Sequence, residues 1–330
     1  MSKRFVALSA AGLGLLGCRY YFGGEQNTYT TTMRGRKILI TGNPDGVATE
    51  IVRDLANRGA FIYWYNHDSK KVRRNISDLA KLSYYLNKED PYVEYHKLDP
   101  TNSTDVKSVA DSLKEQSIII DVLINVPYDY NSDSQTHGLN SRSEATLRNL
   151  KAPIDMLEQM HPLLHMSGEG RVINLVPYLR DEPVKDGMPN YDDLFSQEVK
   201  DVNFSEFIED TSKAILALTK CQQDQMHVLN RHIKVVAVNP GMTRDRLVRT
   251  YMPSFVTGRM YDLMTILAVP FAKSDKEAAQ TALYAIMKPW HEIKGGQYYS
   301  NCKEANANYG DWEKLWEKTT NFVRASENKN

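Results

Sequence analysis

The sequence of 330 residues predicts an α/β fold built on a single doubly wound parallel sheet with helices on both faces. Short apolar runs rich in β-branched residues alternate with segments of helical periodicity, which is the pattern of successive strand–helix–strand units. The alternation continues from Ile38 to about Tyr299 with no break that would separate two cores. We therefore expect one domain over residues 36–330, preceded by a distinct segment over residues 1–35.

The individual elements follow from the changes in apolar periodicity along the chain. Apolar runs predict strands at residues 37–41, 61–65, 92–96, 121–126, 171–176 and 233–238. Apolar residues spaced three and four apart predict helices, most clearly at residues 48–59, 104–116 and 204–226. Parallel strands joined in this order require right-handed crossovers, which place helices on both faces of the sheet.

The composition is that of an ordinary globular protein. Lys and Arg together number 41, as do Asp and Glu, so no basic surplus is available to neutralise nucleic-acid phosphates. The three cysteines, Cys18, Cys221 and Cys302, are too few and too scattered for a disulfide framework or a metal site. We expect neither a nucleic-acid partner nor a bound metal.

The N-terminus differs from the rest of the chain. Lys3 and Arg4 precede an apolar run from Phe5 to Cys18, and aromatic residues follow at 20–22. This pattern favours a membrane anchor, although the run is short for a full span of roughly 20 residues. It also fits a mitochondrial targeting segment, since Glu25 is the first acidic residue, and LLGC at 15–18 resembles a lipoprotein cleavage box. Residues 23–35 are expected to form a polar linker.

A glycine-containing turn, TGNPDGVA at 41–48, lies between the first strand and the first helix of the domain. Gly42 and Gly46 would allow backbone N–H groups to approach a pyrophosphate at the positive end of the helix. The alternative is a turn that needs glycine only for its geometry.

The order and spacing of many short motifs make the resemblance to a known family specific. The motifs are KILITG, HKLDP, DVLIN, RNLKAP, RVINLV, YDDL, TSKAILALTK, VNPGMTR, AKSDKEAAQ and LWEKT. With them the chain resembles the short-chain dehydrogenase/reductase family, and within it the membrane-associated retinol dehydrogenase branch, most of all its mitochondrial type. The resemblance implies a Rossmann-type fold, NAD or NADP as cofactor, and a lipophilic alcohol or carbonyl as substrate. It also implies a membrane location, with the mitochondrial inner membrane favoured over the endoplasmic reticulum, and a homo-oligomer formed through helix 204–226.

The resemblance also assigns roles to individual residues. Cofactor binding falls to Gly42 and Gly46 in the phosphate loop, Asp99 at the adenine, Asn125 after the fourth strand, Lys213 at the nicotinamide ribose, and Pro240 and Gly241 beside the nicotinamide. Asn149 corresponds to the asparagine that anchors a water in the proton relay, and Lys213 to the lysine that lowers the pKa of the catalytic tyrosine.

Two catalytic positions of the family are changed in this chain. Glu209 stands at the position of the catalytic tyrosine, four residues before Lys213, and Pro177 stands at the position of the serine that polarises the carbonyl. No Ser or Thr lies between Gly170 and Phe195, so a small shift of register does not restore the serine.

The expected cofactor slot departs from the family as well. Asp45 brings a negative charge into the phosphate loop, and Tyr128 places a bulky ring where the family has a glycine. His67 stands where many NADP-dependent members have an arginine. These departures leave the binding of NAD or NADP open.

The changes at 177 and 209 predict a loss of the family's chemistry. Carbonyl reduction needs a proton donor and a partner for the developing oxyanion. A glutamate near an ammonium group is ionised at neutral pH and cannot donate. Each missing donor is expected to lower the rate roughly 100- to 1000-fold. Glu209 and Lys213 are instead expected to form an ion pair along one helix face.

Three functions therefore remain open. The chain is interpreted first as a catalytically degenerate, membrane-associated member of the family that acts as a binding or structural protein, with a protein partner or a second copy. The alternatives are an NAD(P)-dependent oxidoreductase with an unusual acid, and a nicotinamide nucleotide sensor without turnover.

One further stretch, residues 251–271, is rich in Met, Phe and Tyr. We expect a helix packed against the body of the domain. A soft, Met-rich surface that binds lipid, a membrane or a partner protein is the alternative.

Overall fold

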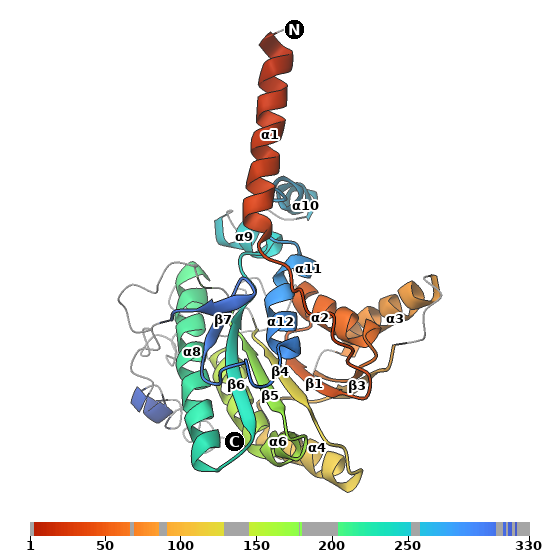
Figure 1. The fold of residues 1–330 in the computed structure, drawn as a ribbon, viewed down its shortest axis with the longest axis vertical. Helices are drawn as coiled ribbons and strands as arrows, with labels where there is room; N and C mark the ends of the chain where they lie inside the picture. Colours follow the sequence, from red (N-terminus) through yellow and green to blue (C-terminus); the bar gives the residue numbers. More distant parts are fainter. Residues whose placement is uncertain are drawn as a thin grey trace.

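The computed structural model describes residues 3–66, 69–85, 91–128, 145–177, 179, 204–251, 258–307, 313–314, 316–318 and 321. These residues form one eight-stranded sheet with the strand order β3-β2-β1-β4-β5-β6-β7-β8 (Figure 1). The strands are β1 (Lys37–Gly42), β2 (Phe61–Asn66), β3 (Val93–Lys97), β4 (Val122–Val126), β5 (Gly170–Leu175), β6 (Ile233–Asn239), β7 (Tyr298–Ser300) and β8 (Lys303–Ala305). The doubly wound α/β fold expected from the sequence is confirmed.

One strand departs from the all-parallel sheet that was predicted. Strands β1 to β7 pair in parallel, whereas β8 pairs with β7 in antiparallel fashion. The two residues between them, Asn301 and Cys302, both have positive φ angles, of 50° and 54°. Two such residues make a type I′ hairpin turn, which reverses the chain without a crossover helix.

Helices lie on both faces of the sheet (Figure 1). They are α1 (Lys3–Gly23), α2 (Gly46–Asn57), α3 (Ser69–Tyr85), α4 (Ser103–Glu115), the π-helix η1 (Leu147–Lys151), α6 (Ala152–Met166), α8 (Phe204–Val228), α9 (Arg244–Tyr251), α10 (Gly258–Leu267), α11 (Asp275–Ala278) and α12 (Gln280–Met287). Successive residues of β1 point to opposite faces, so Ile38 and Ile40 pack with α2 and α12 while Leu39 packs with α4 and α6. This alternation divides the core into two layers.

The chain order reverses at β1 and β4, which are neighbours in the sheet although three helices and two strands separate them in sequence. Crossovers leave this point in opposite directions, so a crevice forms between the loops that follow the two strands. The fold therefore places the β1–α2 turn and the residues after Val126 at one common edge.

Helix α1 projects away from the body of the domain (Figure 1). In the described part of the chain, no helix is both long enough and apolar enough to cross a membrane. The residues that follow α1 are not a detached linker, because Met33 is buried and its N–H donates to the carbonyl oxygen of Arg58 at 3.0 Å. Asn27 likewise donates its backbone N–H to the side chain of Gln280. The expected polar linker is a strap held against the domain.

Candidate functional site

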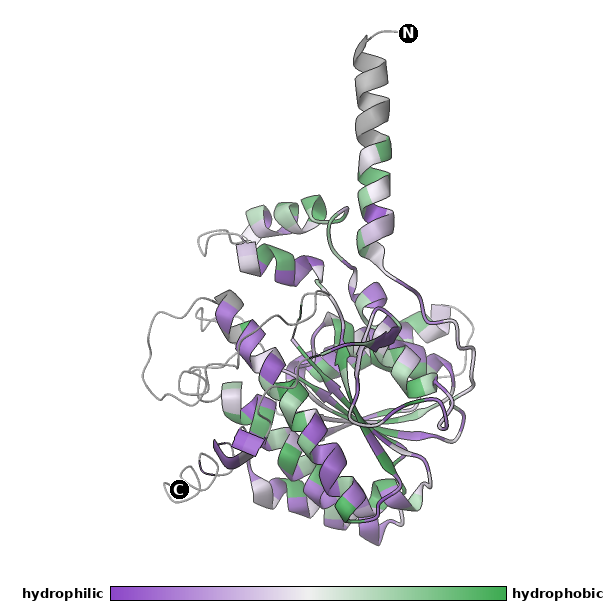
Figure 2. Ribbon diagram, turned by 60° about the vertical axis from the view of Figure 1, so that its left-hand side comes forward, coloured by the Kyte–Doolittle hydropathy of each residue, from purple (hydrophilic) through white to green (hydrophobic). Residues whose placement is uncertain are grey.

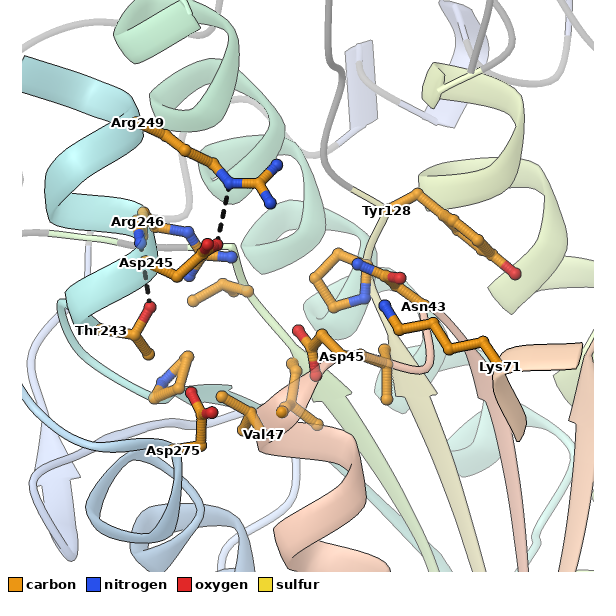
Figure 3. A pocket seen from close by; sticks show the side chains of 16 residues that line it. Asn43, Asp45, Val47, Lys71, Tyr128, Thr243, Asp245, Arg246, Arg249 and Asp275 are labelled. Atoms are coloured by element: carbon orange, nitrogen blue, oxygen red, sulfur yellow. Dashed lines mark hydrogen bonds and ion pairs between the residues drawn. The ribbon is translucent and has the colours of Figure 1, made fainter. Parts of the chain in front are cut away.

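A cavity with a volume of about 260 Å³ lies at the carboxyl edge of the sheet. The β1–α2 turn forms one wall, and the ends of β4, β5 and β6 form the floor. Helix α9 closes the cavity on another side, with Asp245, Arg246 and Arg249, and Lys71 reaches it from α3 (Figure 3). This is the crevice where doubly wound sheets bind their ligands.

Gly42 serves the packing of the sheet. Its φ angle is +105°, and a Cβ atom at this position would overlap the carbonyl oxygen of Val126 on the neighbouring strand. The N–H of Asn43 donates to the same carbonyl oxygen at 3.1 Å. The glycine that was assigned to the phosphate loop is therefore required for the close approach of β1 and β4, whether or not a nucleotide binds.

Replacement of Gly42 by Ala is expected to destabilise the protein by about 3 kcal/mol or more, through backbone strain and overlap together. Gly168→Ala is a matched control, because Gly168 also has a positive φ, +76°, but has open space around it. That variant should lose about 1 kcal/mol. Equal losses in urea unfolding of the two variants would contradict the close approach at Gly42.

Asp45 is the N-cap of α2. Its side chain accepts a hydrogen bond from the backbone N–H of Ala48 at 2.7 Å. A carboxylate at this position satisfies one of the free N–H groups in the first helical turn and also benefits from the positive end of the helix dipole. The chain itself thus supplies an anion at the place where a pyrophosphate would bind.

A second carboxylate, that of Asp275, lies against the same turn. A Cβ atom at Gly46 would overlap the carboxylate of Asp275, which is the first residue of α11. Figure 3 shows Asp45 and Asp275 on the same side of the cavity, close to Val47. Burial raises the pKa of Asp275, and the nearby carboxylates of Asp245 and Glu50 raise it further. The first turn of α2 is therefore occupied by the chain's own acidic groups.

The raised pKa of Asp275 makes stability depend on pH. The folded chain holds this proton more tightly than the unfolded chain, so the stabilisation is present below the unfolded pKa and is lost as pH rises through the folded pKa. Asp275→Asn should therefore be more stable than the parent at neutral pH, with the difference closing toward about pH 4. Urea unfolding between about pH 4 and pH 8 tests this expectation, and the exposed Asp111→Asn serves as the control.

Tyr128 fills the other half of the crevice. The residue is buried, and its hydroxyl accepts a hydrogen bond from Nδ2 of Asn66, at the end of β2, at 3.3 Å. The guanidinium of Arg148 lies over the ring, with its Cζ atom 5.3 Å from the ring centroid. Burial raises the pKa of the Tyr128 hydroxyl well above its usual value, so it is a poor proton donor. A flat ring of the protein thus lies between the ends of β4 and β2, in the crevice that the sequence resemblance assigned to the cofactor.

Asn149 and Asp99 hold this arrangement in place. The side chain of Asn149 accepts from the backbone N–H of Tyr128 at 2.6 Å and donates to its carbonyl oxygen at 2.8 Å. Asp99 accepts from the backbone and the hydroxyl of Thr101 and lies 3.7 Å from Arg148. The π-helix η1, which carries both Arg148 and Asn149, is a distortion that is frequent at functional sites. In this chain Asn149 binds the backbone of Tyr128, and Asp99 lies beside the Arg148 that covers its ring.

Asn125 belongs to a buried polar network beneath the crevice. Its Nδ2 donates to Oδ1 of Asn174 at 2.8 Å, and Nδ2 of Asn174 donates to Thr219 and Gln222 on α8. Asn125 lines a second, much smaller cavity of about 20 Å³, and its buried Oδ1 has no hydrogen-bond partner among the described residues. This volume suits one water molecule. The network ties β4 and β5 to α8.

Glu209 and Lys213 form the ion pair that their spacing predicted. Oε1 of Glu209 lies 2.8 Å from Nζ of Lys213, with side chains that are 59% and 12% exposed. Pro177 is buried just after the end of β5. None of the three lines either of the two cavities described above. His67 lies outside the described residues.

Pro240 and Gly241 follow β6 at the floor of the site. Pro240 lines the larger cavity. Gly241 has a φ of +82° and donates its N–H to Oδ1 of Asn239 at 2.9 Å. The side chain of Lys273 lies against it, within 3.1 Å of the place a Cβ atom would take.

The crevice as it stands does not fit a dinucleotide. Its volume of about 260 Å³ is below the usual range for small-molecule sites, roughly 300–1,000 Å³. Tyr128 fills one end, and the carboxyl groups of Asp45 and Asp275 lie at the first turn of α2 at the other end, in a lining that also contains Lys71, Arg246 and Arg249. Sequence reasoning found Asp45 and Tyr128 but missed Asn66, Arg148 and Asp275. The only available signal for Asp275 was the sequence S-D-K-E, typical of a helix start, which does not reveal that this start faces α2.

Comparison with known proteins agrees with the fold. Residues 36–187 match the short chain dehydrogenase family. The chain is 25% identical to retinol dehydrogenase 12 of Homo sapiens, over 86% of this chain and 84% of that protein. It is 24% identical to retinol dehydrogenase 14 of Homo sapiens (82% and 80%) and 23% identical to polyprenol dehydrogenase of Homo sapiens (86% and 84%).

Solved structures share the architecture. A protein of Mycobacterium paratuberculosis superimposes with a TM-score of 0.61 at 17% identity, covering 91% of this chain and 98% of that one. The oxidoreductase yciK of E. coli gives 0.59 at 15% identity, covering 84% and 98%. The sequence match over residues 36–187 and the shared fold make the chain similar to the short-chain dehydrogenase/reductase family, with retinol dehydrogenases among its relatives.

Proposed function

We propose that this protein is a catalytically degenerate short-chain dehydrogenase that works as a membrane-associated binding or structural protein. The observation that carries the proposal is the filling of the dinucleotide crevice by the chain's own groups. Tyr128 lies in the adenosine half, and Asp45 and Asp275 lie at the phosphate half. Members of the family generally bind a nicotinamide nucleotide, and these three side chains oppose that binding.

The catalytic end supports the same proposal. Glu209 forms an ion pair with Lys213 and would have to give up that pairing to act as an acid toward an alkoxide. Pro177 has neither a hydroxyl nor an N–H to stabilise an oxyanion. Within the described cavity lining, the remaining hydroxyls belong to Tyr128, whose pKa is raised, and to Thr243.

Membrane association through α1 is part of the proposal. The basic and apolar N-terminal sequence forms a continuous helix that projects from the body. The mitochondrial inner membrane is the favoured location and the endoplasmic reticulum the alternative. In a binding or structural role the protein would bind a protein partner, or a second copy of itself through α8.

Turnover measurements test the proposal directly. The full-length protein, with retinal and NADPH or NADH, and with retinol and the oxidised cofactors, should give no activity above background. Lys213→Ala and its control Lys220→Ala, which breaks a similar ion pair with Asp224 on the same helix, should give the same background. Activity that survives in Lys220→Ala and vanishes in Lys213→Ala would overturn the proposal.

An NAD(P)-dependent oxidoreductase acting on a lipophilic alcohol or carbonyl is the second candidate. The observations in its favour are the retained Lys213 and Asn149 and the dehydrogenase names of the relatives. A nucleotide sensor would bind NAD(H) without turnover. Activity separates the first of these from our proposal, and nucleotide-dependent melting separates the second.

A further inference from the structure

We propose that helix α10 and the residues around it rest on the lipid bilayer, so that the protein has a second membrane contact beside α1. The contact surface, which we call the apolar platform, consists of Phe22, Met260, Leu263, Ile266, Leu267 and Phe271. The inference rests on the membrane association proposed above and adds a defined surface and orientation to it.

The exposure of α10 is the first observation. None of its ten residues is buried, and Met260, Leu263, Ile266 and Leu267 are 51%, 51%, 65% and 57% exposed. At 3.6 residues per turn these four lie on one face of the helix, opposite Tyr261, which contacts α9. The prediction of a packed helix in this stretch is therefore wrong. A contiguous apolar surface of this kind marks an interaction site.

The position of the platform relative to α1 is the second observation. The guanidinium of Arg19 pairs with both carboxylate oxygens of Glu277 and donates to the carbonyl oxygen of Ala272 at 3.1 Å. The rings of Phe22 and Phe271 pack edge to face with centroids 6.4 Å apart. The last turns of α1 are thus fixed to the segment that follows α10.

The arrangement of the two helices favours a bilayer as the occupant. Figure 2 shows α1 extending outward and α10 lying across its direction near its base. Leu13 and Leu16 are exposed along α1, and Tyr20 and Tyr21 are exposed near its end. Aromatic residues concentrate at membrane interfaces, and amphipathic helices lie in that plane. A bilayer that covers α1 from Leu13 to its C-terminal end would also cover the apolar platform. The exposed side chain of Arg259 is long enough to reach headgroup phosphates.

The platform is connected to the crevice. The hydroxyl of Tyr261 contacts the carboxylate of Asp245, donates to the carbonyl oxygen of the same residue at 3.3 Å, and lies 3.4 Å from Nε of Arg249. Asp245 and Arg249 belong to the α9 wall of the cavity. That wall of the cavity therefore lies next to the bilayer, and a ligand would enter the crevice from the membrane side.

Quenching of tryptophan by brominated phospholipids tests the platform in the full-length protein bound to phosphatidylcholine vesicles. Leu263→Trp places the reporter on α10, and Lys114→Trp places it at the end of α4, on the opposite end of the molecule (Figure 1). The fluorescence of the added tryptophan is obtained by subtracting the signal of the parent protein. For Leu263→Trp the brominated lipids should reduce it by more than about half, because interfacial helices insert about 5–10 Å into the boundary of headgroups and acyl chains. Lys114→Trp should be unaffected, and both variants should melt like the parent.

The outcomes separate the two proposals. Protein that binds vesicles without quenching at position 263 would overturn the platform, leave the anchoring by α1 in place, and indicate a protein as the cover of α10. Protein that does not bind vesicles at all would overturn both the anchoring and the platform. The catalytic proposal is tested by turnover and is unaffected by either result.

Discussion

Millimolar NADPH or NADH is expected to leave the melting temperature of the full-length protein unchanged. A ligand present at 100 times its dissociation constant would add about 2.7 kcal/mol to the free energy of unfolding, so binding in the usual micromolar range would be visible. The expectation follows from Tyr128 in the adenosine half and from Asp45 and Asp275 at the phosphate half. A clear upward shift would show that the nucleotide binds in spite of these side chains, and the turnover measurement would then decide between the oxidoreductase and the sensor.

Neutralising the phosphate half should recover part of the affinity. The double variant Asp45→Ser, Asp275→Asn keeps an N-cap side chain on α2 while it removes two negative charges. Two like unit charges at 4 Å repel by about 4 kcal/mol at an effective dielectric constant of 20, so each removal should strengthen nucleotide binding at least about tenfold. Asp78→Asn, Asp111→Asn, which removes two exposed carboxylates elsewhere, is the matched control. Equal nucleotide affinity in the two double variants would mean that charge does not close the crevice.

Much of the fold was predictable because its core strands obey simple rules. Each of the six predicted strands is found within one residue of its expected ends, since a buried parallel strand is a short apolar run between turns. Strands β7 and β8 have only three residues each, too few for a periodic signal. Their turn uses Cys302 at positive φ, a conformation that the identity of a cysteine does not suggest.

The error over α10 has a different cause. Apolar periodicity shows that a helix has an apolar face, and a soluble domain normally buries such a face against its own core. The structure leaves the apolar face of α10 uncovered. The helix follows α9 outside the sheet, and none of its residues is buried. Sequence alone does not say whether the covering phase is protein or lipid.

The site was predictable only where its residues lie near each other along the chain. Asp45 and the Glu209–Lys213 pair could be recognised from local spacing. The contact of Asp275 with Gly46 joins α11 to α2, distant in sequence, and depends on the packing of two helix starts. The contact of Asn66 with Tyr128 likewise depends on the positions of β2 and β4 on either side of β1.

Tyr128 should be the most sensitive position of the crevice. Tyr128→Ala is expected to lower the free energy of unfolding by about 3–5 kcal/mol, the usual cost of removing a buried aromatic ring. The loss includes the packing of the ring under Arg148. Tyr128→Phe keeps the ring and loses the hydrogen bonds of the hydroxyl with Asn66 and Arg148, so it should cost about 1–2 kcal/mol. Urea unfolding of the two variants measures both values.

The same pair of variants tests whether Tyr128 takes the place of adenosine. The cavity left by Tyr128→Ala would have Asn66, Arg148 and Asp99 around it, with polar groups that suit a base and a ribose. Adenosine, which has no phosphate to meet Asp45 or Asp275, should therefore raise the melting temperature of Tyr128→Ala and leave Tyr128→Phe and the parent unchanged. A response of all three proteins would place adenosine elsewhere. A response of none would mean that the crevice collapses when the ring is removed, and Tyr128 would then be a core residue and not a substitute for a ligand.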